Sequence, residues 1–420
     1  MHIAAIPSNS ISSSRSKAHL LVLALFVPLV MVVFGLAILQ RPYEVGSDYY
    51  NQSLDAKALD ETGDTIKLRA NPLTMWSIIA VHTVLPNIDY LTSALYVGLL
   101  YSAFLGVALY FVIAAALESR ARTFGGAVLA VVLAIGLMVV TPVTMPTWAM
   151  RNLYYGYIGI NTYHNPSILA LKPFALLVSV FAVIALMQPT RFRSIGTVAL
   201  CAVLTALSVL AKPNFALCLL PALAILAGFK LLKHQPVNWP LVIFGIALPA
   251  LALLAYQYLF TYGGDSVQDS DIIFAPLTAL SLKDRLVLLP PKFFLSILFP
   301  FSVYALFFKT ARRSVLLNLA WLMFLCGAFQ MYFLAETGER LHDGNFFWSG
   351  HITLFLLFVA SVVFVIQQRP ISITTRGTWE MSPRFVTCVG MFALHLVSGF
   401  LYYSVYAAHT LLGLDPARWV

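Results

Sequence analysis

Long apolar runs recur along the whole chain, and they constrain the fold more than any other feature. Each is about 20 residues long, the length at which a helix crosses the hydrocarbon core of a bilayer. The runs lack the apolar-polar alternation of membrane barrel strands, and backbone groups in hydrocarbon must be hydrogen-bonded within their own segment. The sequence is 60% hydrophobic and 10% charged over 420 residues. A soluble domain is about a quarter charged. We therefore predict an all-α membrane protein.

The runs predict a polytopic bundle of about 11 transmembrane helices. The first run follows Arg15 and Lys17 and has no small-x-small cleavage site, so we expect an uncleaved helix rather than a signal peptide. The expected spans are 19–40, 89–117, 123–141, 167–187, 195–211, 214–231, 239–260, 292–308, 314–334, 350–366 and 385–408. No repeat or separate soluble domain is visible, so we expect a single transmembrane domain over residues 1–420.

Basic residues gather in the segments that join alternate spans. With the N-terminus in the cytoplasm, the inner segments hold 14 basic residues and 2 acidic ones. The basic residues are Arg15, Lys17, Arg120, Arg122, Arg191, Arg193, Lys230, Lys233, Lys309, Arg312, Arg313, Arg369, Arg376 and Arg384. The remaining 12 basic and 15 acidic residues are expected outside or at the outer boundary. Because basic residues favour the inner side, we predict a protein of the inner (plasma) membrane with a periplasmic C-terminus. The net charge of +9 then reflects topology and contact with anionic lipid, not nucleic-acid binding.

Cysteine and metal chemistry receive little support from the sequence. The four cysteines, which all fall inside apolar runs, are Cys201, Cys218, Cys326 and Cys388. We expect them to be buried apolar side chains without disulfides. Asp48, His164, His342 and Asp343 could be gathered into a metal site by the fold, but none has a ligand spacing such as His-x-x-x-His. No cofactor is expected, and a divalent metal stays a minor alternative.

The first outer loop, about 41–88, combines acidic residues with a short apolar stretch. Asp48 lies only about eight residues past the first run, close enough to face a cavity at the membrane surface. A solvated loop acid is the alternative. The stretch NPLTMWSIIAVH, residues 71–82, is too short to span the bilayer, so we expect an interfacial helix there.

This arrangement resembles the GT-C superfamily of membrane glycosyltransferases, which includes the protein O-mannosyltransferases and the transferase that adds aminoarabinose to lipid A. In that family an acidic residue soon after the first helix precedes interfacial helices and a Pro-Leu-x-x-Trp-like start of the second helix. SDYYNQ (47–52) and NPLTMWSIIAVH (71–82) are similar to these features. LSVLAKPNFALCLLPAL (207–223) is similar to the family's Leu-rich helix, Lys with Gly or Pro, and short apolar helix.

The resemblance covers about 19–231 as a GT-C-like core and leaves 232–420 as variable C-terminal helices. It implies an inverting transfer of a sugar from a polyprenyl-phosphate-linked donor to a glycan, lipid or protein acceptor on the periplasmic face. Asp48 is then the general base that deprotonates the acceptor hydroxyl. Ser47-Asp48 stands where the mannosyltransferases have an Asp-Glu pair, so the subfamily and the sugar stay open.

Lys212 lies between two apolar runs and is followed by Pro213. A charge at mid-membrane costs about 2.5 to 3.5 kcal/mol on insertion scales, so we expect Lys212 to face water, a partner or a phosphate. A lysine whose charge snorkels to the interface is the alternative.

The second outer loop, about 142–166, supplies candidate binding residues. Arg151 and neighbouring tyrosines have the mixed chemistry that binds sugars and phosphates, although an interfacial aromatic belt explains the tyrosines equally well. The pair His164-Asn165 precedes Pro166, so it is either aimed into a cavity or a simple helix N-cap.

The last large outer loop, 335–349, carries seven polar or charged side chains over residues 336–348, which favours a binding loop over a solvated turn. Lys212, Arg151 and Arg340 are the candidates for the donor phosphate. The weaker candidates for holding sugar and acceptor are His164, Asn165, Glu336 and Asp343.

Two other functions remain open. An O-antigen-type polymerase or ligase relies on arginines in a large outer loop, but the 261–291 loop offers only Arg285 together with Lys283. A secondary transporter predicts broken helices in related halves and acids near the middle of the membrane. The sequence has no repeat, and its acids lie at the outer boundary.

Overall fold

The computed structural model describes residues 13–63, 70–144, 156–262, 271–281, 286–368, 371–373 and 379–413. Within these ranges nine helices are long and apolar enough to cross a membrane. They are α1 (Ser13–Ile38), α4 (Tyr90–Leu117), α6 (Pro166–Met187), α8 (Asn214–Leu232), α9 (Leu248–Tyr262) with its π-helical start η5 (Leu241–Ala247), α11 (Leu289–Leu306) preceded by η6 (Leu286–Leu288), α13 (Val315–Phe333), α14 (Phe347–Gln367) and α15 (Pro383–Leu412). The predicted all-α membrane class is confirmed at this level.

The other two expected spans, 123–141 and 195–211, form shorter apolar helices. These are α5 (Phe124–Val139) and α7 (Ile195–Ala211), with 16 and 17 residues. Five of these apolar helices begin at a side chain that accepts a backbone N–H, as an N-cap does. The five caps are Asp89 for α4, Thr123 for α5, Asn165 for α6, Ser194 for α7 and Ser314 for α13.

The first loop is mostly helical. After η1 (Arg41–Tyr43), α2 (Asp48–Thr62) begins at the N-cap Ser47 and ends at Gly63, whose φ of 68° lies in the left-handed region that glycine adopts without strain. The expected helix at 71–82 is α3 (Leu73–Val84). Both helices pack against α4 and against each other.

Two small sheets were not predicted from the sequence. Strands β1 (Ile272–Phe274) and β2 (Leu334–Glu336) pair antiparallel, with Ile272 opposite Glu336. Strands β3 (Ile371–Ile373) and β4 (Trp379–Met381) form the second pair. The first sheet joins the loop after α9 to the loop after α13, which carries η7 (Gly338–His342).

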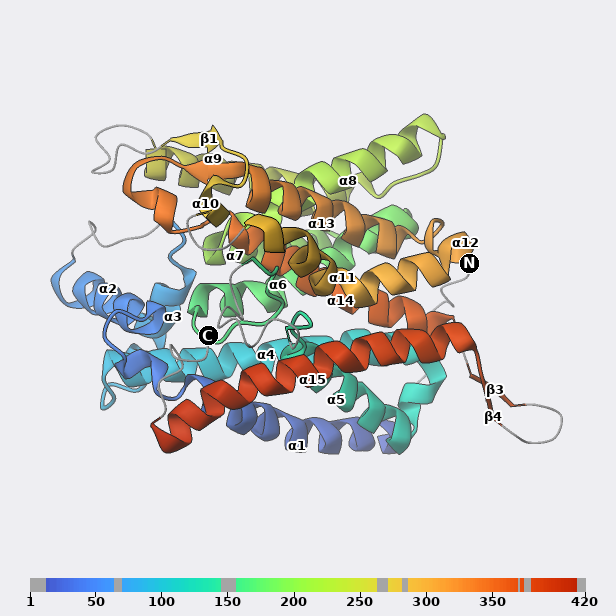
Figure 1. The fold of residues 1–420 in the computed structure, drawn as a ribbon, viewed down its shortest axis with the longest axis horizontal. Coiled ribbons are helices and arrows are strands. Elements are labelled where there is room, and N and C mark those ends of the chain that lie inside the picture. The colour runs from blue at the N-terminus through green and yellow to red at the C-terminus, as the bar shows by residue number, and fades with distance from the viewer. Residues whose placement is uncertain are drawn as a thin grey trace.

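Many of the described basic residues lie at one end of the bundle. Helices α2 and α3 and strand β1 lie at one end in Figure 1, called here the α2 end. The short helix α12 (Phe308–Ala311) and the β3–β4 pair lie at the other. Helices α4, α6 and α8 end away from α2, so the segments after them share that second end, with η3 (Glu118–Arg122) following α4. The described basic residues at this second end include Arg120, Arg191, Arg193, Lys230, Lys233, Lys309, Arg312 and Arg313.

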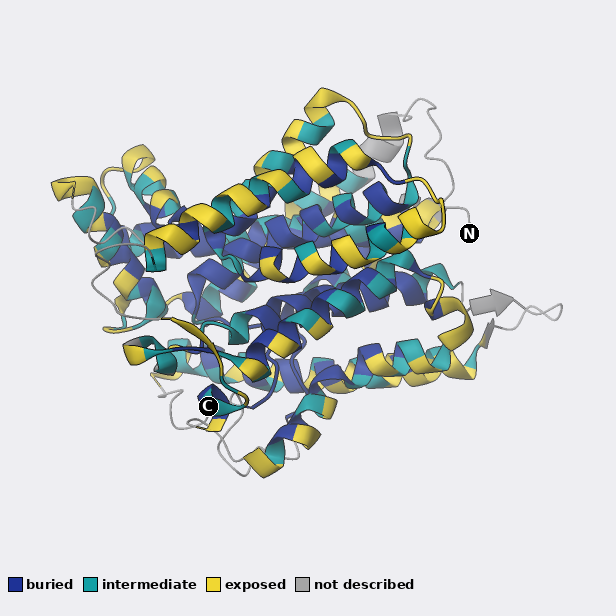
Figure 2. Ribbon diagram, turned by 90° about the horizontal axis from the view of Figure 1, so that it is seen from above, coloured by how far each residue is buried: buried dark blue, intermediate teal, exposed yellow. Residues whose placement is uncertain are grey.

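Helix α14 forms the centre of the core. Nearly all of it is buried, and it packs against α13, α8, α11 and α4. Buried residues fill the interior of the bundle in Figure 2, and exposed residues lie on its outer helices. Two lysines are also buried inside the bundle, Lys172 in the second turn of α6 and Lys292 in the first turn of α11. The sequence predicts that every charge outside the inner segments lies at or beyond the outer boundary, and it does not predict the burial of these two lysines. Single lysines escape detection because the apolar residues around them dominate the run.

Candidate functional site

Asp48 and Asn165 are hydrogen-bonded across 117 positions of sequence at the α2 end. Asn165 Nδ2 donates to Asp48 Oδ2 at 2.7 Å, while Asn165 Oδ1 accepts the backbone N–H of Ile168 at 3.0 Å. The cap requires the amide oxygen to face the helix, so the amide nitrogen faces Asp48. The N-cap interpretation of Asn165 is therefore confirmed, and the free end of the same amide faces the Asp48 carboxylate.

The segment before Asp48 is fixed by its own hydrogen bonds. Ser47 Oγ donates to the carbonyl oxygen of Arg41 at 2.6 Å and accepts the N–H of Tyr50 at 3.1 Å. Asp48 is thus the first residue of a capped helix, where a carboxylate interacts favourably with the helix dipole. Burial raises the pKa of the neighbouring Tyr49 phenol above its ordinary value, and the Asp48 carboxylate raises it further.

His164 lies beside the same carboxylate. Burial lowers the pKa of His164 below its ordinary value, the Asp48 carboxylate opposes this effect, and the positive charges of Arg41 and Lys212 add to it. The imidazole is therefore neutral at neutral pH, where it can accept or donate a hydrogen bond. Its ring centre lies 5.8 Å from that of Trp348, in the first turn of α14.

Lys212 approaches the site from the break between α7 and α8. It is the C-cap of α7, with extended backbone, and its N–H donates to the carbonyl oxygen of Ser208 at 3.1 Å. Pro213 then starts α8. Lys212 Nζ lies 5.2 Å from the centre of the Trp348 ring, a cation–π distance. We call Asp48, His164, Asn165, Lys212 and Trp348 the Asp48 group.

A second group forms around the buried carboxylate of Glu336. Tyr262 Oη donates to Glu336 Oε1 and Asn345 Nδ2 donates to Glu336 Oε2, both at 2.5 Å. Arg340 Nη2 lies 3.0 Å from Glu336 Oε1. Arg340 is therefore committed to an ion pair, and the structure does not bring it into contact with the Asp48 group.

Asn214, which follows Lys212 and Pro213, links the two groups. Its Nδ2 donates to the carbonyl oxygen of Asn345 at 2.9 Å and to Ser349 Oγ at 2.8 Å. In the sequence, Asn214 is distinguished only by its place directly after the Lys212-Pro213 break, and that place does not predict a binding role.

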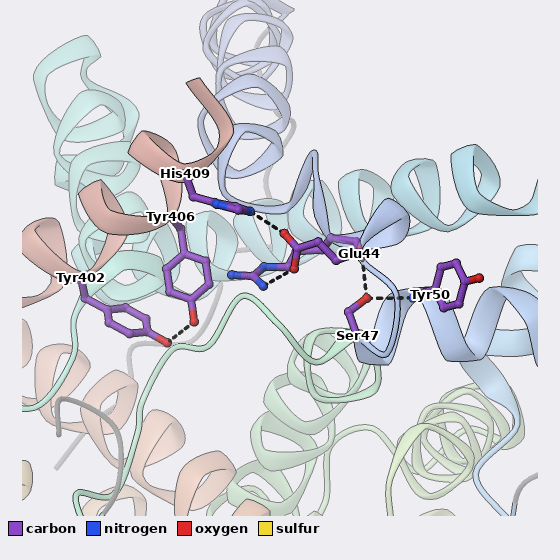
Figure 3. A network of polar contacts seen from close by, with 7 residues as sticks. Glu44, Ser47, Tyr50, Tyr402, Tyr406 and His409 are labelled. Atoms are coloured by element: carbon purple, nitrogen blue, oxygen red, sulfur yellow. Dashed lines mark hydrogen bonds and ion pairs between the residues drawn. The ribbon is translucent and has the colours of Figure 1, made fainter. Parts of the chain in front are cut away.

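The end of α15 holds the segment that precedes Asp48. His409 Nε2 lies 2.6 Å from Glu44 Oε1, and Arg41 Nη1 donates to Glu44 Oε2 at 2.5 Å (Figure 3). The Arg41 guanidinium also lies 4.7 Å from the centre of the Tyr406 ring. A helix more than 350 residues later therefore fixes the approach to Asp48, and sequence reasoning did not identify these contacts.

The remaining candidates are not placed in either group. Arg151 lies outside the described residues, and the side chain of Asp343 is exposed. The described part of the chain contains no cluster of three or more His, Cys, Asp or Glu residues arranged to hold a metal ion. All four cysteines are free, and none is exposed.

The Asp48 group combines a proton acceptor, a neutral imidazole, an ammonium group and an indole face. These can respectively take up a proton, hydrogen-bond a hydroxyl, bind a phosphate and stack against a sugar ring. The fold and this site define a multi-pass helical membrane protein with a polar site at one end of its bundle. No model of a known protein family, no curated protein and no solved structure matches the chain.

Proposed function

We propose that the chain is a GT-C-type glycosyltransferase, which moves a sugar from a polyprenyl-phosphate-linked donor to an acceptor hydroxyl on the periplasmic face. The observation that supports it best is the hydrogen bond from Asn165 to Asp48, with His164 and Lys212 beside it. In this arrangement a hydrogen-bonded carboxylate and a cation both act on the same buried imidazole, at one end of a helical bundle. Such a pair is what an inverting transfer from a phosphate-linked donor requires.

In the proposed reaction Asp48 is the general base. Asn165 occupies Oδ2, so Oδ1 accepts the proton of the acceptor hydroxyl. The acceptor oxygen attacks the anomeric carbon as the bond from that carbon to the phosphate oxygen breaks. The polyprenyl phosphate leaves with the bonding electrons, and the anomeric configuration inverts.

Lys212 is the first candidate to neutralise the charge that grows on the leaving phosphate. Arg340 and Arg151 remain predictions for the same role, and Arg340 would have to exchange its ion pair with Glu336 for the phosphate. His164 and Asn165 are assigned to sugar or acceptor hydroxyls, and Glu336 and Asp343 remain weaker candidates. No cofactor is part of the proposal.

The membrane arrangement is part of the same proposal. Helices α5 and α7 would complete about 11 crossings, while α2 and α3 would lie at the interface. The basic end that carries α12 would face the cytoplasm together with the N-terminus, and the α2 end and the C-terminus would face the periplasm of the inner membrane. The separation of basic residues from the Asp48 group supports this orientation.

A transfer assay with Asp48→Asn tests the function. The full chain in nanodiscs would be supplied with radiolabelled polyprenyl-phosphate sugars and an envelope lipid or glycan extract. Because an amide has the shape of a carboxylate but cannot accept the proton, turnover should fall about 10² to 10⁴-fold with little change in thermal stability. Glu61→Gln, an exposed acid of the same helix, is the matched control and should retain activity. Unchanged transfer by Asp48→Asn would remove Asp48 as the base.

A further inference from the structure

Lys172 is a buried lysine to which the described part of the chain supplies no counter-ion. It is 3% exposed. Its Nζ donates to Asn161 Oδ1 at 2.6 Å and lies 4.8 Å from the centre of the Phe355 ring. No carboxylate forms an ion pair with it among the residues that the structure describes. A buried ammonium group without an opposite charge is strongly unfavourable, so a lysine in this position keeps its proton only if an anion binds beside it.

Asn161 offers Lys172 only one acceptor atom. Asn161 Nδ2 donates to the carbonyl oxygens of Leu137 at 3.0 Å and Val140 at 2.8 Å, near the C-terminal end of α5. Both amide hydrogens are therefore used, and Oδ1 is left to face the lysine. An ammonium group has three donors, so Lys172 retains hydrogen-bonding capacity beyond this contact.

A small cavity adjoins Lys172 and Asn161 among α1, α4, α5 and α6. It has room for about one or two water molecules. Thr162 and Tyr163 also line it, each 7% exposed, and their hydroxyls have no hydrogen-bond partner among the described residues. Burial raises the pKa of Tyr163 above its ordinary value, so its hydroxyl stays protonated and can donate. No carboxylate belongs to the described lining.

We propose that this cavity binds a chloride ion, held by the ammonium group of Lys172 and the hydroxyls of Thr162 and Tyr163. A positive charge together with hydroxyl donors selects an anion over a cation. The size of the cavity excludes a phosphate head group or a sugar, whereas chloride is only slightly larger than water. The bound anion offsets the buried charge of the lysine.

This anion site adjoins the Asp48 group along the chain. Thr162 and Tyr163 immediately precede His164 and Asn165 in the segment that leads into α6. Bound chloride would hold this segment and, through it, the hydrogen bond from Asn165 to Asp48. A ligand that binds only the folded state also raises its stability.

Thermal unfolding of the purified full chain tests the proposal. The unfolding midpoint would be measured in sodium chloride and in sodium gluconate at equal ionic strength. We expect it to rise with chloride concentration in the wild type and to lose this dependence in Lys172→Met. Methionine preserves much of the side-chain volume and removes the buried charge, so stability in gluconate should not fall. Lys57→Met, at a side chain that is 52% exposed, is the control and should respond to chloride as the wild type does.

Equal midpoints in the two salts would overturn the proposal and leave the cavity to water. A full chloride response in Lys172→Met would overturn it as well. If Lys172→Met does not fold, Tyr163→Phe decides, because it removes one hydroxyl but keeps the ring stacked 5.7 Å from Tyr402. That variant should need severalfold more chloride for the same shift. Crystals grown in bromide should show an anomalous scattering peak beside Lys172 Nζ, and its absence would count against the site.

Discussion

Asn165 holds the Asp48 carboxylate with the same side chain that caps α6. Its Nδ2 donates to Asp48 Oδ2 at 2.7 Å, and its Oδ1 accepts the N–H of Ile168. The start of a core helix and the start of α2 are thus joined through one amide. Any movement of the loop before α6 would move the partner of the proposed catalytic base.

Asn165→Asp separates the two roles of this amide. Aspartate caps a helix as well as asparagine does, so α6 should be retained. It cannot donate to Asp48, however, and it adds a like charge that disfavours ionisation of the pair. We expect the acidic limb of the pH–turnover profile to move to higher pH, with a smaller loss at the optimum. A uniform loss of activity at all pH values would indicate a structural role only.

Lys212→Gln and Arg340→Gln distinguish two of the three proposed phosphate ligands. A charged hydrogen bond contributes about 1.5 to 3 kcal/mol, so losing a direct phosphate contact should weaken donor binding about 10- to 100-fold. We expect this loss for Lys212→Gln, measured with a polyprenyl-phosphate sugar in nanodiscs. Arg340→Gln should mainly lower the thermal midpoint, because it leaves the buried Glu336 without its counter-ion. The reverse pattern would transfer the phosphate role to Arg340.

The pH dependence of stability should report on His164. Burial lowers its pKa in the folded state, so the unfolded chain takes up this proton at higher pH than the folded chain does. The free energy of unfolding should therefore decrease as the pH falls through about 6.5 and level off below the folded-state pKa. His164→Asn should make this decrease shallower. His234→Asn changes an exposed histidine and should leave the slope as in the wild type.

Reporter fusions test the proposed orientation. Fusions after Arg122, Arg193, Lys233 and Arg313 should report the cytoplasm, because basic segments are retained on that side. A fusion near Asp60 should report the periplasm. A cytoplasmic signal at Asp60 would invert the arrangement and remove Asp48 from the periplasmic face.

The sequence by itself determined the helical class and the positions of the long apolar helices. The length and apolar composition of a run predict a helix without reference to the rest of the chain. The run 89–117 forms α4, and the run 350–366 lies within α14. The break at Lys212 and the helix start after Asn165 were also readable, because a proline and a capping side chain act on their immediate neighbours.

Only the tertiary structure decided which side chains meet. Nothing near Glu44 in the sequence indicates His409, and nothing near Asp48 requires Asn165. The same holds for the burial of Lys172, which a run of apolar neighbours conceals. Backbone conformation and membrane insertion are set by residues within a turn or a span of each other. Contacts between loops depend on how complete helices pack, and that packing depends on the whole chain.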